Sequence, residues 1–230
     1  MAANEYPGAE PFVPRGKPGL AALAEAAGDC RGCDLFKRAS QTVFGTGSPH
    51  ARMMLVGEQP GDAEDKQGKP FVGPAGRVLA RALGEARIAE EDSYITNAVK
   101  HFRWRDPPGG GKRRIHQRPD AWQVRACWPW LSAEIDRVNP RVIVALGAVA
   151  GQALFGSSFR VGAHRGRAQP WRLDGGRRDG GGSGGRDRIV VATIHPSAVL
   201  RATDRDGAYR GLVDDLAVAC DALGPNARSS

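Results

Sequence analysis

The sequence predicts an α/β fold, a three-layer α/β/α sandwich around a central, mainly parallel, four-stranded sheet. Short apolar runs, typical of buried parallel strands, alternate along the chain with segments whose apolar residues recur at helical spacing. Strands that alternate with helices form parallel sheets covered on both faces. The chain has 230 residues, of which 41% are hydrophobic, which suffices for one domain with a substantial core.

Apolar runs rich in Val, Ile and Leu predict strands at 52–56, 141–147 and 189–194, and Ser93-Tyr94-Ile95-Thr96-Asn97 predicts a further strand. Helical spacing of apolar residues predicts helices over 20–27, 76–88, 120–138, 148–155 and 209–223.

Two residues mark features of the helix predicted over 120–138. Asp120 fits its N-cap, since a carboxylate there accepts hydrogen bonds from free backbone N–H groups. Pro129 lies inside the apolar pattern and is expected to kink or split the helix.

Composition divides the chain into one domain with flexible additions. Residues 1–17 are rich in Pro and polar groups and predict a flexible lead, 18–223 form the single domain, and 224–230 are a disordered tail. Inside the domain, 105–118 form a basic loop, and 174–187 form a flexible loop rich in Gly and Arg.

The charge favours a polyanionic partner. The formal net charge is +8 and the sequence pI is about 9.8, so DNA or RNA is the simplest partner. No stretch approaches the roughly 20 apolar residues of a membrane span, and the first residues lack the pattern of a signal peptide. We therefore expect a cytoplasmic protein with reduced thiols and no membrane partner.

Several polar residues follow predicted strands directly. Glu58 and Gln59 come after the first strand, Asn97 ends the second, and His195 follows the fourth. Because the carboxyl ends of parallel strands lie at one edge of a sheet, these side chains are expected to form one ligand site.

A second candidate site combines cations with an imidazole. Lys112, Arg113 and Arg114 precede Ile115 and His116, after a Pro-Gly run. Cations bring a phosphate backbone close, and a neutral imidazole is a nucleophile or a proton carrier. The segment indicates chemistry on a nucleic acid, whereas a solvated basic loop is the plainer interpretation of such a run.

These motifs resemble the uracil-DNA glycosylase superfamily, and within it the bacterial iron–sulfur branch. The matching segments are Cys30-x-x-Cys33, Gly57-Glu58-Gln59-Pro60-Gly61, Gly68-x-Pro70-Phe71-Val72-Gly73, Thr96-Asn97-Ala98-Val99-Lys100 and His195-Pro196-Ser197, in the family's order. The loop Lys112-Arg113-Arg114-Ile115-His116 resembles that of UdgX-type members, which become covalently linked to DNA.

The resemblance implies a uracil pocket. Phe71 would stack on the flipped base, and Asn97 would pair with the uracil edge, since a carboxamide offers both a donor and an acceptor. His195 would face uracil O2 and stabilise the charge left on the base. Uracil binding would also involve Gly57, Gln59 and Asp62.

The resemblance also implies a covalent end point. His116 would capture C1′ of the sugar after the base leaves, with Glu58 accepting a proton from its imidazole or orienting it. The protein would act in DNA repair, once per molecule, and release free uracil. Contacts with the DNA backbone would come from Lys112, Arg113, Arg114 and Ser197.

The cysteines complete the implied features. A C-x-x-C in a reducing compartment is more typical of a metal or redox pair than of a disulfide, and no strand precedes Cys30 as in thioredoxins. By resemblance, a [4Fe-4S] cluster would be held by Cys30, Cys33, His101 and Cys127. Cys220 as the fourth ligand, and zinc in place of iron, stay open.

Two other functions stay open as well. One is a conventional hydrolytic glycosylase on the same fold, in which water captures the sugar. The other is a non-catalytic, metal-stabilised DNA-binding protein, which charge and cysteines alone would permit. For the covalent glycosylase we expect a monomer that acts on single-stranded DNA, with double-stranded DNA as a further substrate.

Overall fold

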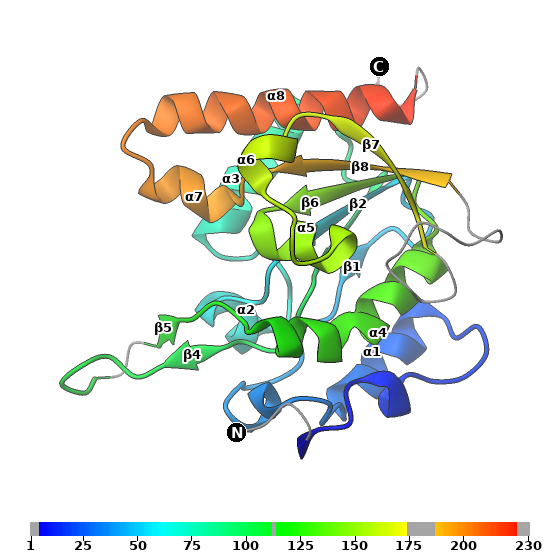
Figure 1. Ribbon diagram of the computed structural model, residues 1–230, viewed down its shortest axis with the longest axis vertical. Helices are drawn as coiled ribbons and strands as arrows, with labels where there is room; N and C mark the ends of the chain where they lie inside the picture. The colour runs from blue at the N-terminus through cyan, green and yellow to red at the C-terminus, as the bar shows by residue number, and fades with distance from the viewer. Residues whose placement is uncertain (1–4, 112–113, 174–186, 225–230) are drawn as a thin grey trace.

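The central sheet confirms the predicted α/β class. The computed structural model describes residues 5–111, 114–173 and 187–224, and Figure 1 shows the sheet between two layers of helices. Its six strands run in the order β1-β3-β2-β6-β8-β7. Their bounds are β1 Thr46–Gly47, β2 Met53–Gly57, β3 Ser93–Asn97, β6 Val142–Leu146, β7 Ala168–Arg172 and β8 Asp187–Thr193.

The predicted count of four strands was too low by the two edge strands. The four predicted strands are β2, β3, β6 and β8, and they pair in parallel. The missed strands, β1 and β7, pair antiparallel at the two edges. β1 has only two residues, and β7 contains Pro170 and is largely exposed, so neither carries the apolar run of a buried strand.

The register of the parallel strands brings their carboxyl ends together. Gly57 at the end of β2 pairs with Asn97 at the end of β3, and Leu146 of β6 pairs with Thr193 of β8. The segments that follow these residues therefore leave the sheet at one edge, as predicted.

The helices cover both faces of the sheet. One face carries α1 Leu20–Gly28, α4 Ala121–Val138 and α5 Ala148–Phe155, and the other carries α3 Pro74–Glu85, α7 Pro196–Arg201 and α8 Arg205–Leu223. Successive residues of β6 alternate between the two cores: Ile143 packs with the first group and Val144 with the second.

Shorter elements fill the connections. These are the helices α2 Asp62–Gln67 and α6 Val161–His164, the 3-10 turns η2 Glu10–Phe12 and η3 Asp34–Lys37, and the strands β4 Trp104–Arg105 and β5 Ile115–His116. β4 and β5 pair antiparallel, with Trp104 opposite His116. In Figure 1 this hairpin projects from the body of the protein next to α2.

Helix α4 begins as predicted but is not split. The backbone N–H of Asp120 donates to Oε1 of Gln123 at 2.8 Å, in a capping box that starts the helix. Pro129 lies inside an uninterrupted helix from Ala121 to Val138, next to Trp130, which is fully buried. Packing of the long apolar face against the sheet holds the helix together across the proline.

The described part of the predicted N-terminal lead lies against the domain. Ala9 is buried, and its N–H donates to the carbonyl of Ala126 in α4 at 2.7 Å. The predicted tail beyond residue 224, and the Gly/Arg-rich loop apart from Asp187, lie outside the described residues. Among the described helices, none is both long and apolar enough to cross a membrane.

Candidate active site

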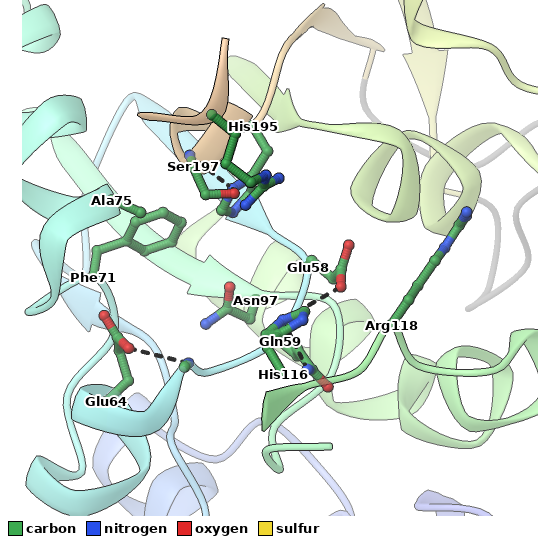
Figure 2. A pocket seen from close by; sticks show the side chains of 12 residues that line it. Glu58, Gln59, Glu64, Phe71, Ala75, Asn97, His116, Arg118, His195 and Ser197 are labelled. Carbon is green, nitrogen blue, oxygen red and sulfur yellow. Dashed lines mark hydrogen bonds and ion pairs between the residues drawn. The ribbon is translucent and has the colours of Figure 1, made fainter. Parts of the chain in front are cut away.

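A cavity of about 560 Å³ opens at the carboxyl edge of the sheet. Figure 2 shows side chains from β3, the hairpin and the loops after β2 and β8 converging on it. The lining residues are Glu58, Gln59, Gly61, Glu64, Phe71, Ala75, Asn97, His116, Arg118, His195, Ser197 and Arg201.

Asn97 lies at the back of the cavity with an unused acceptor. It is 2% exposed, and its Oδ1 is buried with no hydrogen-bond partner among the described residues. Opposite it, a Cβ on Gly57 would overlap both Oδ1 and the ring of Phe71, so only glycine fits there. A buried acceptor without a partner is costly unless a ligand satisfies it, which points to a ligand that donates to Asn97.

Phe71 presents its ring to the cavity from a strained backbone. Its φ is +56°, a left-handed conformation that is rare for an aromatic residue. A Cβ on Gly76 would overlap the Phe71 carbonyl oxygen, so the glycine permits this close turn. Such strain costs about 1–3 kcal/mol and is concentrated at functional sites. The ring lies 6.0 Å from that of His195, centroid to centroid, with the two planes tilted by 31°, and both rings line the cavity.

The hydrogen bonds of His195 fix its tautomer. Nδ1 accepts from the backbone N–H of Ser197 at 3.2 Å and lies 2.8 Å from the Ser197 hydroxyl oxygen. Burial, followed by the positive influence of His116 and Arg201, lowers the pKa of His195 to about 4. The ring is therefore neutral at pH 7 and carries its proton on Nε2.

His116 reaches the cavity from β5. Its Nε2 lies 2.9 Å from Nε2 of Gln59 and 3.6 Å from Oε1 of Glu58 (Figure 2). The amide of Gln59 is oriented by Arg103, whose N–H donates to Oε1 at 3.0 Å, so the Gln59 nitrogen is the donor toward His116. Nε2 of His116 therefore accepts this hydrogen bond with its lone pair, and the proton of the neutral ring lies on Nδ1.

Electrostatics keep His116 neutral. Burial lowers its pKa from the ordinary 6.5, the positive charge of Arg201 lowers it further, and Glu64 opposes this. Burial raises the pKa of Glu58, against the opposing effect of Arg118 and Arg201. Half of the His116 side chain remains exposed, so a large substrate can reach it.

Arg114 anchors the hairpin to α2. Its Nε lies 2.5 Å from Asp62 Oδ1 and its Nη1 lies 2.6 Å from Asp65 Oδ2. The guanidinium also lies over the rings of Phe102 and Trp104, at 5.2 and 5.4 Å. Only 13% of the Arg114 side chain is exposed, because its guanidinium binds carboxylates of the protein itself. The sequence had predicted that Arg114 contacts DNA phosphate, whereas in the structure it binds Asp62 and Asp65.

Two other predicted site residues also have partners within the protein. Asp62 binds Lys66 and Arg114 and does not line the cavity, although uracil binding was predicted for it. The Ser197 hydroxyl lies at the cavity beside Nδ1 of His195. Lys112 and Arg113 lie outside the described residues.

Three charged lining residues were not predicted from the sequence, and neither was Ala75. Glu64 accepts from the N–H groups of Gly61 and Gly73, at 3.0 and 2.8 Å, and so joins the loop after β2 to the loop that carries Phe71. Its position three residues after Gly61 is the spacing of a capping box, which was a detectable signal. Arg201 follows Ser197 by four residues and shares its helix face. Arg118 is the last residue of the predicted basic loop and had no distinguishing pattern.

The three cysteines of the predicted cluster lie in one core. Cys30, Cys33 and Cys127 are buried in the core cluster on the side of the sheet that carries α1, α4 and α5. Burial raises the pKa of Cys33 to about 12, and burial together with the other two thiols raises that of Cys127. Cys220 packs on the opposite face of the sheet, on α8, and is therefore remote from them.

His101, the fourth predicted ligand, is buried and neutral. Burial lowers its pKa to about 4, and its Nε2 lies 3.0 Å from the Thr42 hydroxyl. Within the described ranges, no group of three or more His, Cys, Asp or Glu side chains is arranged to hold a metal ion. The described side chains thus bring three thiols into one core but do not form a compact single-ion site.

The fold and the cavity together define an α/β protein with a pocket at the carboxyl edge of its sheet, lined by an aromatic ring, an amide and two imidazoles. The chain belongs to the uracil DNA glycosylase superfamily, whose family model matches residues 44–217.

The chain is similar in sequence to several type-4 and type-5 uracil-DNA glycosylases. The chain is 36% identical over 179 residues to a type-4 uracil-DNA glycosylase of Thermotoga maritima, covering 78% of this chain and 82% of the relative. It is 33% identical over 195 residues to a type-4 enzyme of Pyrobaculum aerophilum, covering 83% and 89%. A type-5 uracil-DNA glycosylase of Thermus thermophilus is 32% identical over 161 residues, covering 60% and 66%.

Proposed function

We propose that this protein is a uracil-DNA glycosylase that removes uracil from DNA as the first step of base excision. The observation that carries the proposal is the unpartnered Oδ1 of Asn97, buried in the same cavity as Phe71 and His195. Family membership and the type-4 relatives support the same activity. The base must leave the DNA stack to enter such a pocket.

Asn97 would select uracil. Its Oδ1 would accept from uracil N3–H, and its amide nitrogen would donate to O4. Cytosine presents the opposite pattern at these positions and would leave buried groups unpaired, at a cost of about 1–3 kcal/mol for each. Phe71 would stack on the ring, close to His195.

His195 would stabilise the departing base. Breaking the bond between N1 and C1′ leaves the electron pair on uracil, and O2 shares that negative charge. The proton on Nε2 of the neutral His195 ring supplies a donor in a buried setting, where it is most effective. Gln59, Gly57 and Glu64 would shape the rest of the pocket, each by the contacts described above.

His116 would then capture the sugar. The lone pair of its neutral ring forms a bond to C1′, the bond from C1′ to N1 is broken, and the ring becomes a cation. The carboxylate of Glu58, whose Oε1 lies 3.6 Å from Nε2, would orient the ring and balance that charge, and the proton on Nδ1 would be lost to solvent. The product would be a stable conjugate of His116 with DNA, formed once per protein molecule, together with free uracil.

Three thiols and an imidazole would hold a [4Fe-4S] cluster with a structural role. Cys30, Cys33 and Cys127 share one core, and His101 is buried and neutral, the form in which imidazole binds metal. When bound, the cluster would fasten the N-terminal segments to α4. Iron and sulfide analysis of the purified protein tests this, and stoichiometric zinc without sulfide would contradict it.

The DNA contacts would come from the cations around the cavity. Arg118 and Arg201 line it, and Lys112 and Arg113 stand between β4 and β5 in the sequence. Half-exposed His116 suits a strand that can bend freely, so single-stranded DNA is the preferred substrate of this proposal. We expect a monomer in the cytoplasm.

A denaturing gel tests the proposal. The protein is mixed with a labelled, uracil-containing, single-stranded oligonucleotide, beside a His116→Ala variant. A shifted band that survives heat and detergent, and is absent for the variant, is expected. Strand breakage after alkali without a shifted band would indicate a hydrolytic glycosylase. If neither appears and no uracil is released, the protein only binds DNA.

A further inference from the structure

Behind Asn97 lies an ion pair that the proposed reaction does not use. Lys100 is 1% exposed and Glu134 is fully buried, and Nζ lies 2.5 Å from Oε2. Neither residue lines the cavity. A buried ion pair is weak evidence for stability, because desolvating both charges offsets much of their attraction. The contacts that Lys100 and Glu134 make with β3 indicate another role for the pair.

All three protons of the Lys100 ammonium group have acceptors. Besides Glu134, Nζ donates to the Thr96 hydroxyl at 2.7 Å and to the backbone carbonyl of Asn97 at 2.8 Å. The ammonium group therefore binds the end of β3. There it donates to the backbone carbonyl of Asn97, the residue whose side chain faces the cavity.

Glu134 gathers donors from the neighbouring backbone and strands. Its Oε1 accepts from the Tyr94 hydroxyl at 3.0 Å, the Thr96 hydroxyl at 2.9 Å and the N–H of Gly45 at 3.1 Å. Burial and the negative charge of Glu134 raise the pKa of Tyr94, which keeps that hydroxyl protonated as a donor. The carboxylate therefore fixes β3 from the side of α4.

The opposite side of the same segment is held by backbone hydrogen bonds. Ala98 N–H donates to the Gly57 carbonyl at 2.9 Å, and Val99 N–H donates to the Glu58 carbonyl at 3.0 Å. Asn97 thus lies between two sets of restraints, one from the loop after β2 and one from the ion pair. Its direction into the cavity follows from both.

We propose that Lys100 and Glu134 are a positioning pair that orients Asn97 for recognition of the uracil edge. The inference rests on the proposed function, because it assigns Asn97 to the base. A misplacement of about 1 Å at a reacting or recognition group can reduce a rate about a hundredfold. The pair acts through Asn97 and touches neither base nor sugar.

The test is a charge-neutral replacement, Lys100→Met with Glu134→Gln. Removing both charges avoids leaving one ion buried alone, and the glutamine oxygen still accepts from Gly45 and Tyr94. The excision rate in a single turnover is expected to fall about a hundredfold, and the affinity for free uracil should fall with it. The matched control is Arg81→Met with Glu85→Gln, an exposed pair on α3, which should leave both unchanged.

A double-mutant cycle with Asn97→Ala separates positioning from a general structural role. If the pair acts through Asn97, the neutral replacement should have less than about a twofold further effect in the Asn97→Ala background. A full further loss in that background, or an unchanged rate in a folded Lys100→Met, Glu134→Gln protein, would overturn the inference. A wild-type protein that releases no uracil would instead refute the proposed function itself, before any variant is compared.

Discussion

The two sides of the cavity are built differently. Asn97 and His195 leave the ends of β3 and β8, and Asn97 is 2% exposed inside a network of buried hydrogen bonds. His116 stands on a two-residue strand of a projecting hairpin, with half of its side chain exposed (Figure 1). The strand side is rigid and suits recognition of a small base. The hairpin is held to the domain mainly by the contacts of Arg114 and Gln59, and its exposed face is open to a long substrate such as a DNA strand.

This comparison separates two reactions. Changes on the strand side should abolish excision and every later step. Changes on the hairpin side should spare the release of uracil and reduce only the formation of the covalent product.

The largest effect is expected for His195→Ala. Loss of one donor to a developing oxyanion lowers a rate by about 10²–10³-fold, so both uracil release and adduct formation should fall by that factor. Single-turnover measurement of free uracil checks it. Ser197→Ala, which removes only the hydroxyl beside Nδ1, should cost far less, and an equal loss in the two variants would contradict the role of the ring.

Arg114→Ala should separate the two sides most clearly. It leaves the carboxylate of Asp65 buried without its cation, at a cost of about 3 kcal/mol, which corresponds to a fall in melting temperature of about 10 °C. Adduct formation should fall more than uracil release, because the hairpin loses its attachment to α2. The matched control is Arg105→Ala on the same hairpin, whose side chain is exposed; similar losses in both would refute the anchoring role.

Gln59→Ala should have a smaller effect in the same direction. It removes the donor to His116 and the contacts with Arg103 and Gln117, so the imidazole is less well held. The rate of adduct formation should fall about tenfold, in line with the loss of about 1.4 kcal/mol of hydrogen bonding. The ratio of adduct to released uracil is the quantity to measure, and an unchanged ratio would argue against this contact.

The smallest effect concerns pH. Because the pKa of His116 is lowered below 6.5, its ring stays neutral as the pH falls toward that value, and the ratio of adduct to uracil should hold until more acid conditions. Arg201→Gln removes a positive charge, so the pKa should rise and the decline should begin at higher pH. A decline that begins at the same pH in both proteins would show that Arg201 does not act on His116.

The parallel core of the fold could be predicted because β2, β6 and most of β8 are apolar runs and β3 is a short segment rich in β-formers. The edge strands could not, since β1 has two residues and β7 carries Pro170 and faces solvent. Their pairing is decided by tertiary contact and leaves little trace in local sequence. Pro129 failed as a helix breaker for the same reason, because packing outweighs local preference.

The site could be predicted only in part. Residues directly after strands converge by topology, so the gathering of Glu58, Asn97 and His195 at one cavity was predicted. The ion pair between Arg114 and Asp62 was not predicted, because a cation or a carboxylate in a loop has the same sequence pattern whether it faces solvent or pairs internally.

The left-handed backbone at Phe71 sets two requirements against each other, since the backbone conformation favours glycine and the cavity needs the aromatic ring. Glycine at 71 would relieve the strain, and by the usual scale it would be favoured by up to about 3 kcal/mol at the backbone. It would also delete a ring that faces the cavity and packs against the core formed by α3 and α8, and loss of a buried phenyl ring costs about 3–5 kcal/mol. The strained backbone is therefore tolerated because the ring contributes more in packing than the left-handed conformation costs.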